Sequence, residues 1–220
     1  MKLETLLVEL LTEELPPISL NELGEKFAQL ILEGLQEKIS LEDNGMKFFA
    51  TPRRLGVKIL NVPEKSSNQK KLIKLMPAKI GFDEQKNATQ ALIKKLHSLN
   101  ETDEAVSRIT NKNEKNQEIL YLEKNIPGIN LEDILSEIIN NSINKLPIKK
   151  MMSYQLKDGW TSVNFVRPIK NLLVLHGKKI LDISLLGFTS TNHTFGHRFE
   201  SKEKLLKIDH ADNYEKILFD

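Results

Sequence analysis

The chain has 220 residues, no cysteine and a formal net charge of +2, from 32 basic and 30 acidic residues. The lack of cysteine excludes thiol catalysis, zinc fingers, iron–sulfur clusters and a disulfide-stapled scaffold. The near-balanced charge excludes a diffusely basic nucleic-acid coat, and the 40% hydrophobic and 28% charged content is typical of a folded globular chain.

The first part of the chain predicts a strand, a helix and a strand pair. Residues 3–11 are rich in Leu and Val, which favours a strand. From Leu20 to Ile39 apolar residues recur at helical spacing, with Ser19 as the expected N-cap and Glu22 completing a capping box. Thr51-Pro52 then separates two short apolar runs, 47–50 and 55–62.

In the rest of the chain the predicted helices and strands follow one another in a less regular order. Residues 64–87 are polar and Lys-rich and predict a crossing or an inserted loop. Asn130 is the expected cap of a well-marked helix, which Pro147 terminates. The further predicted elements are helices at 88–99, 131–145 and 214–218, strands at 107–110, 118–124, 171–175 and 180–186, and a loop at 187–199.

This order predicts an α+β fold with mixed or antiparallel sheets and packed helices. We expect a strand-helix-hairpin unit over residues 1–62 and an α+β region over 63–220, cut short at its C-terminal end. Whether the two regions form one continuous domain stays open. No window reaches the ~18 apolar residues of a membrane span, so a cytoplasmic protein without a membrane partner is expected.

Recognisable catalytic and metal-binding motifs are absent from the sequence. No glycine-rich phosphate loop and no HExxH motif occurs. His193 and His197 have ligand spacing, but Gly196 opposes a helix there, so no metal site is expected. Glu13 and Glu14 are adjacent and point to opposite faces of a strand, so they are expected to be structural partners of basic groups.

The arginines are the informative residues, because the chain has only five of them against 27 lysines. Four lie in short motifs that contain Pro or Gly, namely Thr51-Pro52-Arg53-Arg54-Leu55, Phe165-Val166-Arg167-Pro168 and Gly196-His197-Arg198-Phe199. A restrained backbone orients such a side chain for bidentate contact with a phosphate or a carboxylate. The alternative is internal pairing of these arginines with Glu9, Glu13, Glu14 or Asp209. Trp160, the only Trp, is expected in the core.

Together these motifs resemble the beta subunit of bacterial heterotetrameric (α2β2) glycyl-tRNA synthetase. The landmarks are residues 7–9, TEELPP at 12–17, FATPRRL at 49–55, KLPIKKM at 145–151, FVRP at 165–168, Leu186-Gly187 and GHRF at 196–199. The resemblance is loose over 62–125, and the aromatic residue that usually follows the Lys-Met segment is replaced here by Met152-Ser153-Tyr154.

The resemblance implies an N-terminal part of a longer, non-catalytic subunit that supports ATP-dependent glycylation of tRNA(Gly). The implied partners are the alpha subunit and tRNA(Gly), with no DNA. No cofactor is expected in this part, since ATP with Mg is used by the alpha subunit. No catalytic residue is expected, and the residues expected in tRNA binding or at the subunit interface are Arg53, Arg54, Lys149, Lys150, Arg167, His197 and Arg198.

Two alternatives stay open. One is an editing-type hydrolase acting on aminoacyl-tRNA, motivated by the Glu13-Glu14 and His197-Arg198 pairs. The other is a purely structural scaffold in which every arginine pairs internally. With a net charge of +2, any tRNA contact must come from a local basic patch.

Overall fold

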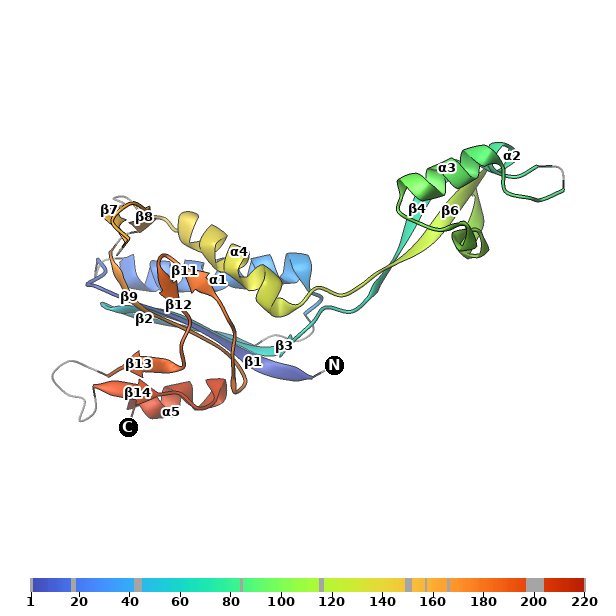
Figure 1. Cartoon of the computed structure of the whole chain (residues 1–220). Coiled ribbons are helices and arrows are strands. Elements are labelled where there is room, and N and C mark those ends of the chain that lie inside the picture. The colour runs from blue at the N-terminus through green and yellow to red at the C-terminus, as the bar shows by residue number, and fades with distance from the viewer. Residues whose placement is uncertain are drawn as a thin grey trace. The chain divides into compact units, whose positions relative to one another are not determined.

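The structure is a computed structural model, and it describes residues 2–16, 19–41, 45–83, 85–114, 117–148, 152–156, 158–165, 167–196 and 204–219. The chain forms two compact units (Figure 1). Unit 1 comprises residues 1–66 and 129–220, and unit 2 comprises residues 67–128. The sequence placed a boundary at 62–63 and did not predict that the chain returns to the first unit at 129.

Unit 1 is built on a five-stranded antiparallel sheet with the strand order β10-β9-β1-β3-β2. The central strand β1 is buried on both faces from Thr5 to Thr12, as its continuous apolar run predicts. The strands of the sheet are β1 (Leu3–Thr12), β2 (Met46–Thr51), β3 (Arg54–Pro63), β9 (Ile169–His176) and β10 (Lys179–Ile180).

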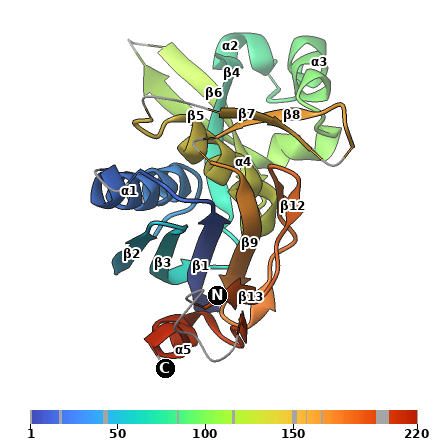
Figure 2. The same ribbon diagram turned by 90° about the vertical axis from the view of Figure 1, so that its left-hand side faces the viewer.

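Two helices cover one face of this sheet (Figure 2). They are α1 (Leu20–Lys38) and α4 (Leu131–Asn144), and their apolar stripes pack on Leu6, Val8 and Leu10 of β1. Both helices were predicted from the spacing of apolar residues to within one residue at each end. Close approach is visible at Gly24 of α1, where an added Cβ would lie 2.7 Å from the Cβ of Ala50 on β2.

Ser19 and Asn130 are the N-cap residues of these helices, as predicted, but the expected side-chain capping bonds are missing. Ser19 makes no side-chain capping bond, and its Oγ instead donates to the carbonyl of Pro16 at 3.4 Å. Asn130 makes no capping bond either, and its amide Nδ2 donates to the Asp133 carboxylate at 3.0 Å. The apolar stripes therefore fix these helices, and the caps contribute little.

The C-terminal segment covers the opposite face of the sheet (Figure 2). Tyr214 is fully buried there, against Leu7 of β1 and Leu173 and Leu175 of β9. The region predicted as a loop, 187–199, contains two short strands, of which one pairs with a strand before the region and the other with a strand after it. The elements are β11 (Ser184–Leu185), β12 (Phe188–Thr189), β13 (His193–Phe195), β14 (Leu205–Lys207), the 3-10 helix η3 (Ala211–Asn213) and α5 (Tyr214–Phe219).

A further hairpin of unit 1, β7 (Met152–Gln155) with β8 (Ser162–Phe165), carries Trp160 in its connecting turn. The prediction that Trp160 lies in the core is wrong, since its side chain is 91% exposed. The Asp158 carboxylate accepts hydrogen bonds from the backbone N–H groups of Trp160 and Thr161, both at 3.0 Å, and this turn holds the indole outside.

Unit 2 is a three-stranded antiparallel sheet with the order β4-β6-β5 and helices packed on one face. The predicted loop at 64–87 is wrong, because strand β4 and helix α2 lie within it, and the predicted strand start at 107 lies in a 3-10 helix. The elements are β4 (Gln69–Pro77), α2 (Ala78–Gly81), α3 (Gln90–Ser98), η2 (Asp103–Arg108), β5 (Ile109–Glu114) and β6 (Gln117–Ile126). The α+β class is confirmed in both units.

Candidate interaction site

Three of the sequence motifs meet at the end of β1 in unit 1, where backbone hydrogen bonds tie them together. Thr12 N–H donates to the carbonyl of Arg53 at 2.9 Å, and Leu15 N–H donates to that of Pro52. Glu13 N–H donates to the carbonyl of Pro168 at 3.0 Å. Segments 12–15, 52–53 and 167–168, far apart in the sequence, thus form one surface, which we call the motif cluster.

Glu14 organises the cations of the motif cluster. Its carboxylate Oε1 lies 2.6 Å from Arg53 Nη2, and its backbone carbonyl accepts a hydrogen bond from Arg167 Nε at 2.9 Å. The Arg53 and Glu14 side chains are 41% and 70% exposed, so this pair is open to solvent or to a partner. Arg167 Nη1 also lies 3.2 Å from the Met152 sulfur, which links the cluster to the β7–β8 hairpin.

Glu13 takes a different cation, since its carboxylate lies 3.3 Å from Lys170 Nζ. Each of the two adjacent glutamates therefore has its own basic partner. This arrangement orients positive side chains at the surface. Neither carboxylate faces the other, so the pair lacks the geometry of a general acid and base.

Arg54, one residue after Arg53, points to the covered face of the sheet. Its Nε lies 2.8 Å from Glu9 Oε2, with the Arg54 side chain 12% exposed and the Glu9 side chain fully buried. Arg54 Nη2 also donates to Thr194 Oγ1 at 3.2 Å and to the carbonyl of Phe195. The internal pairing that the sequence left open is therefore present for Arg54, with Glu9 as its partner.

Two further donors complete the surroundings of Glu9. Thr194 Oγ1 donates to its Oε1, and the Tyr214 hydroxyl donates to its Oε2. Burial, and then the negative charge of Glu9, raise the pKa of Tyr214 well above its usual value. We call Glu9, Arg54, Thr194 and Tyr214 the buried network. It joins β1 and β3 to β13 and α5.

Sequence reasoning missed Thr194 and Tyr214 as members of this network. Glu9 carried the available signal, because it is the only charge inside the apolar run 6–11. A charge at that position must be buried with its partners.

Four predicted site residues lie outside the described residues, namely Lys149, Lys150, His197 and Arg198. Asp209, a predicted arginine partner, accepts from the Asn213 amide instead, at 3.0 Å. Across the described ranges, no group of three or more His, Cys, Asp and Glu side chains is placed to hold a metal ion. Within those same ranges no helix combines the length and apolarity needed to cross a membrane.

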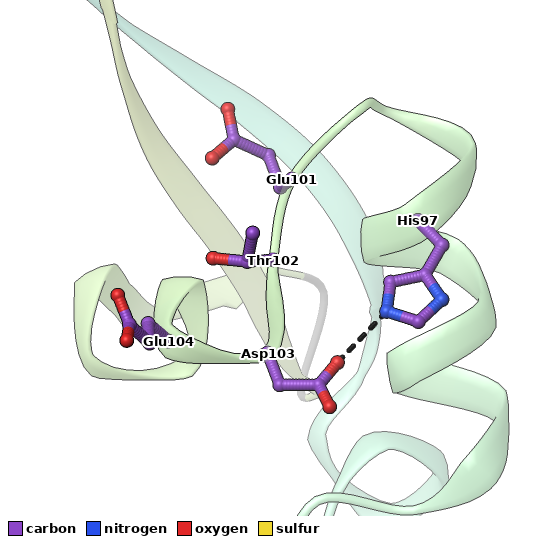
Figure 3. A pocket seen from close by; sticks show the side chains of 5 residues that line it. All are labelled: His97, Glu101, Thr102, Asp103 and Glu104. Atoms are coloured by element: carbon purple, nitrogen blue, oxygen red, sulfur yellow. Dashed lines mark hydrogen bonds and ion pairs between the residues drawn. The ribbon is translucent and has the colours of Figure 1, made fainter.

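Unit 2 contains a separate pocket of about 560 Å³, lined by His97, Glu101, Thr102, Asp103 and Glu104 (Figure 3). The Asp103 carboxylate lies 2.8 Å from His97 Nε2. Hydrogen bonding from Arg108, and then from Lys124, lowers the pKa of Glu101 below its usual value. The carboxylates of Glu101 and Asp103 are thus engaged by basic neighbours within the unit.

The described residues therefore define an α+β protein with a cationic surface cluster built from its own motifs. The family described as Glycyl-tRNA synthetase beta subunit matches residues 6–220, and the chain belongs to this family. The chain is 47% identical over 219 residues to the glycine–tRNA ligase beta subunit of Nitrosomonas eutropha and 44% identical to that of Nitrosomonas europaea. It is 40% identical to the beta subunit of Methylobacillus flagellatus. These alignments cover 98–99% of the chain but only 31–32% of each relative.

Proposed function

We propose that the chain is the N-terminal part of the beta subunit of glycine–tRNA ligase. In this role it belongs to a cytoplasmic α2β2 enzyme and supports the ATP-dependent glycylation of tRNA(Gly), by contacting the alpha subunit and binding tRNA. The observation that carries this proposal is the convergence of the TEELPP, TPRRL and FVRP segments in one motif cluster. Separate stretches of family sequence become one surface there, which is what a contact site requires.

The chemistry of glycine activation is assigned to the partner. ATP with Mg is used by the alpha subunit, and no side chain of this chain is proposed to touch the reacting atoms. The role of the motif cluster is to present oriented cations. Glu14 restrains both Arg53 and Arg167, so less side-chain entropy is lost when a partner carboxylate or phosphate is bound.

Arg53 and Arg167 are the proposed contact residues of the cluster. Arg54 supports them indirectly, because its guanidinium is committed to Glu9 and fixes the strand on which the turn at Arg53 sits. The described residues give little support to an editing hydrolase, since Glu13 and Glu14 are each engaged by a cation. The relatives, all named as beta subunits of the ligase, do not favour that alternative or a pure scaffold.

The experiment compares three arginine variants in the complete beta subunit assembled with the alpha subunit. Arg53→Ala and Arg167→Ala should each lower glycylation of tRNA(Gly), or weaken alpha binding, by about tenfold, the effect of an interfacial charge contact. Arg108→Ala is the matched control. Arg108 is also 41% exposed and also pairs with one glutamate, Glu101 at 2.5 Å, but it lies in unit 2.

Assembly and glycylation are measured separately, by size-exclusion chromatography and by charging of tRNA. Equal activity of Arg53→Ala, Arg167→Ala and the Arg108→Ala control would refute a contact role for the motif cluster. If the chain binds neither the alpha subunit nor tRNA(Gly), the proposed function as a whole is refuted.

A further inference from the structure

The positive charge of the chain is not shared evenly between the two units. Residues 67–128 hold 11 basic and 8 acidic residues, whereas the remaining residues hold 21 basic and 22 acidic. The small net charge of the whole chain thus conceals a basic unit 2 and a nearly neutral unit 1. The basic patch that tRNA contact requires has its best candidate in unit 2.

The sheet of unit 2 has two different faces. Leu120 and Leu122 of β6 point into the core with the helices. Strand alternation turns Tyr121, between them, and Glu123 to the opposite face. The strand pairing places Lys74 of β4 and Thr110 of β5 directly beside Tyr121. No described helix packs its core residues on this opposite face, which we call the outer face.

Lysines dominate the outer face. Lys70, Lys74 and Lys112 project from it by the same alternation, against Glu123 as the described acidic side chain there. Lys70 pairs with Glu123 at 2.5 Å, and Lys112 Nζ lies 5.7 Å from the centre of the Tyr121 ring. The ammonium of Lys112 thus lies over the Tyr121 ring, and the Lys112 residue is exposed at the surface of the sheet.

Three of the eight acidic residues of unit 2 line the pocket of Figure 3, on the helical side of the unit, namely Glu101, Asp103 and Glu104. Glu101 lies 2.5 Å from Arg108 and 3.2 Å from Lys124, and Asp103 lies 2.8 Å from His97. Two of the three carboxylates that line the pocket, those of Glu101 and Asp103, are thus engaged by basic neighbours. The excess of positive charge is consequently expressed elsewhere on the unit, including the outer face.

The chemistry of the outer face fits a phosphate backbone. Lysine ammonium groups are strongly hydrated point charges that contact phosphates without reading the bases. Tyr121 is only 9% exposed, so its ring is not available for stacking on a base. The exposed large apolar side chain on this face is Leu72, 40% exposed, which is too little for the apolar centre of a protein interface.

From these observations we infer that the outer face of unit 2 binds the phosphate backbone of RNA without base specificity, through Lys70, Lys74 and Lys112. On the proposed function, that RNA is tRNA. This assigns to residues 67–128 a binding surface separate from the motif cluster. It also predicts that binding is electrostatic and tolerant of base changes.

The test measures binding of fluorescein-labelled tRNA(Gly) to the 220-residue chain by fluorescence anisotropy over a range of salt concentrations. The outer-face variant combines Lys70→Gln, Lys74→Gln and Lys112→Gln. The matched control combines Lys79→Gln, Lys94→Gln and Lys95→Gln, three exposed lysines of α2 and α3 in the same unit. Both variants remove the same charge, so only the location differs, and circular dichroism confirms that both fold.

For the outer-face variant we expect about tenfold weaker binding near ~50 mM salt and a log–log salt slope reduced by about 2 to 3, roughly one for each phosphate that is no longer neutralised. The control should retain the slope of the unaltered chain within about one. A second tRNA of unrelated sequence should bind with similar affinity, because the bases are not read.

Three results would overturn the inference. If the outer-face variant and the control lose the same affinity for tRNA, binding depends on the total charge of the unit and not on the outer face. Displacement by an acidic polypeptide but not by unlabelled RNA would assign the face to a protein. Failure of the unaltered chain to bind tRNA at any salt would also refute it. In the first two cases the proposed function survives if the alpha subunit still binds and the arginine variants still lose activity.

Discussion

The buried network around Glu9 and the motif cluster around Glu14 each hold one of two consecutive arginines. Arg54 lies within strand β3 and reaches Glu9 on a covered face, while Arg53 lies in the preceding turn and reaches Glu14 at the surface. The same guanidinium–carboxylate chemistry therefore serves two ends. The Arg54–Glu9 pair is shielded from solvent and stabilises the fold. The Arg53–Glu14 pair is exposed and orients a cation for a partner.

The two pairs should differ sharply in what their loss costs. A buried carboxylate without its cation is strongly destabilising, whereas an exposed pair contributes little to stability. Substitutions in and around the two pairs measure this difference in stability cost, and each can either contradict it or give it a value.

The largest effect is expected for Arg54→Ala. This change leaves Glu9 charged and fully buried, so we expect the free energy of unfolding to fall by about 3–5 kcal/mol. Urea denaturation followed by circular dichroism measures it. The double variant Glu9→Leu/Arg54→Met should regain much of the loss, because no charge is then left unpaired. A loss below about 1 kcal/mol for Arg54→Ala would place this pair with the exposed ones.

Tyr214→Phe comes next. The phenol hydroxyl donates to the Glu9 carboxylate in the core, and a hydrogen bond to a charged group contributes about 1.5–3 kcal/mol. The ring contact with Phe49, 5.0 Å between centroids, is retained in the variant, so the loss reports on the hydroxyl alone. Unchanged urea stability would show that the hydroxyl contributes nothing to the buried network.

Alkaline pH tests the same residue. Burial and the charge of Glu9 raise the pKa of Tyr214 in the folded state. The neutral phenol therefore contributes its full stabilisation below the unfolded pKa of about 10. This contribution is lost as the pH rises through the folded pKa. The unaltered protein should lose stability above pH ~10. Tyr214→Phe should lose less over the same range, and parallel pH profiles would contradict this account.

Glu215→Gln should have a smaller effect. Glu215 of α5 bridges Lys47 of β2 and Lys58 of β3, and it is part of how the C-terminal helix is held. Hydrogen bonding from Lys47 and then Lys58 lowers the pKa of Glu215. We expect a loss of about 1 kcal/mol at neutral pH.

Measurements at acidic pH test the sign of the Glu215 contribution to stability. Because the folded pKa of Glu215 is depressed, its contribution is present above the unfolded pKa of ~4.3 and is lost as the pH falls through the folded value. Thermal melts between pH ~6 and ~3 should show the difference between Glu215→Gln and the unaltered chain shrinking. A difference that is constant with pH would contradict it.

Arg53→Ala should have the smallest effect on stability, below about 1 kcal/mol, because its side chain is 41% exposed. Differential scanning calorimetry of this variant beside Arg54→Ala gives the comparison directly. A melting temperature as low as that of Arg54→Ala would mean that the motif cluster is structural. The combination of intact stability with reduced glycylation is the signature of a contact residue.

The sequence was informative where structure is local. The apolar stripes of α1 and α4 and the strand pair around Pro52 were predicted because helical spacing and turn residues are visible in a short window. Strand β4 was missed because it lies at the edge of its sheet with one lysine-bearing face, so its residues 69–77 lack the apolar pattern of a buried strand.

The site was predictable only in part, for a related reason. Motif composition singled out the arginines, but the choice of partner depends on register. Only the pairing of Leu11 with Arg54 turns that side chain toward Glu9 and leaves Arg53 in the turn. Tyr214 could not be connected to Glu9 from the sequence, because 205 residues separate them and nothing local links a helix near the C-terminus to the first strand.

The short bridge between Lys65 and Asn130, where the chain leaves unit 1 and returns to it, has a consequence for the order of folding. Helix α4 must find α1 across the 62 residues of unit 2, and closing so long a flexible segment costs on the order of 3–4 kcal/mol. Unit 2 has its own core, built from contacts nearer in sequence. If it forms first, its paired strands β4 and β6 already hold the two ends together, and the search for α4 becomes short. We therefore expect substitutions in the core of unit 2, such as Leu120→Ala, to slow the formation of unit 1 without touching it.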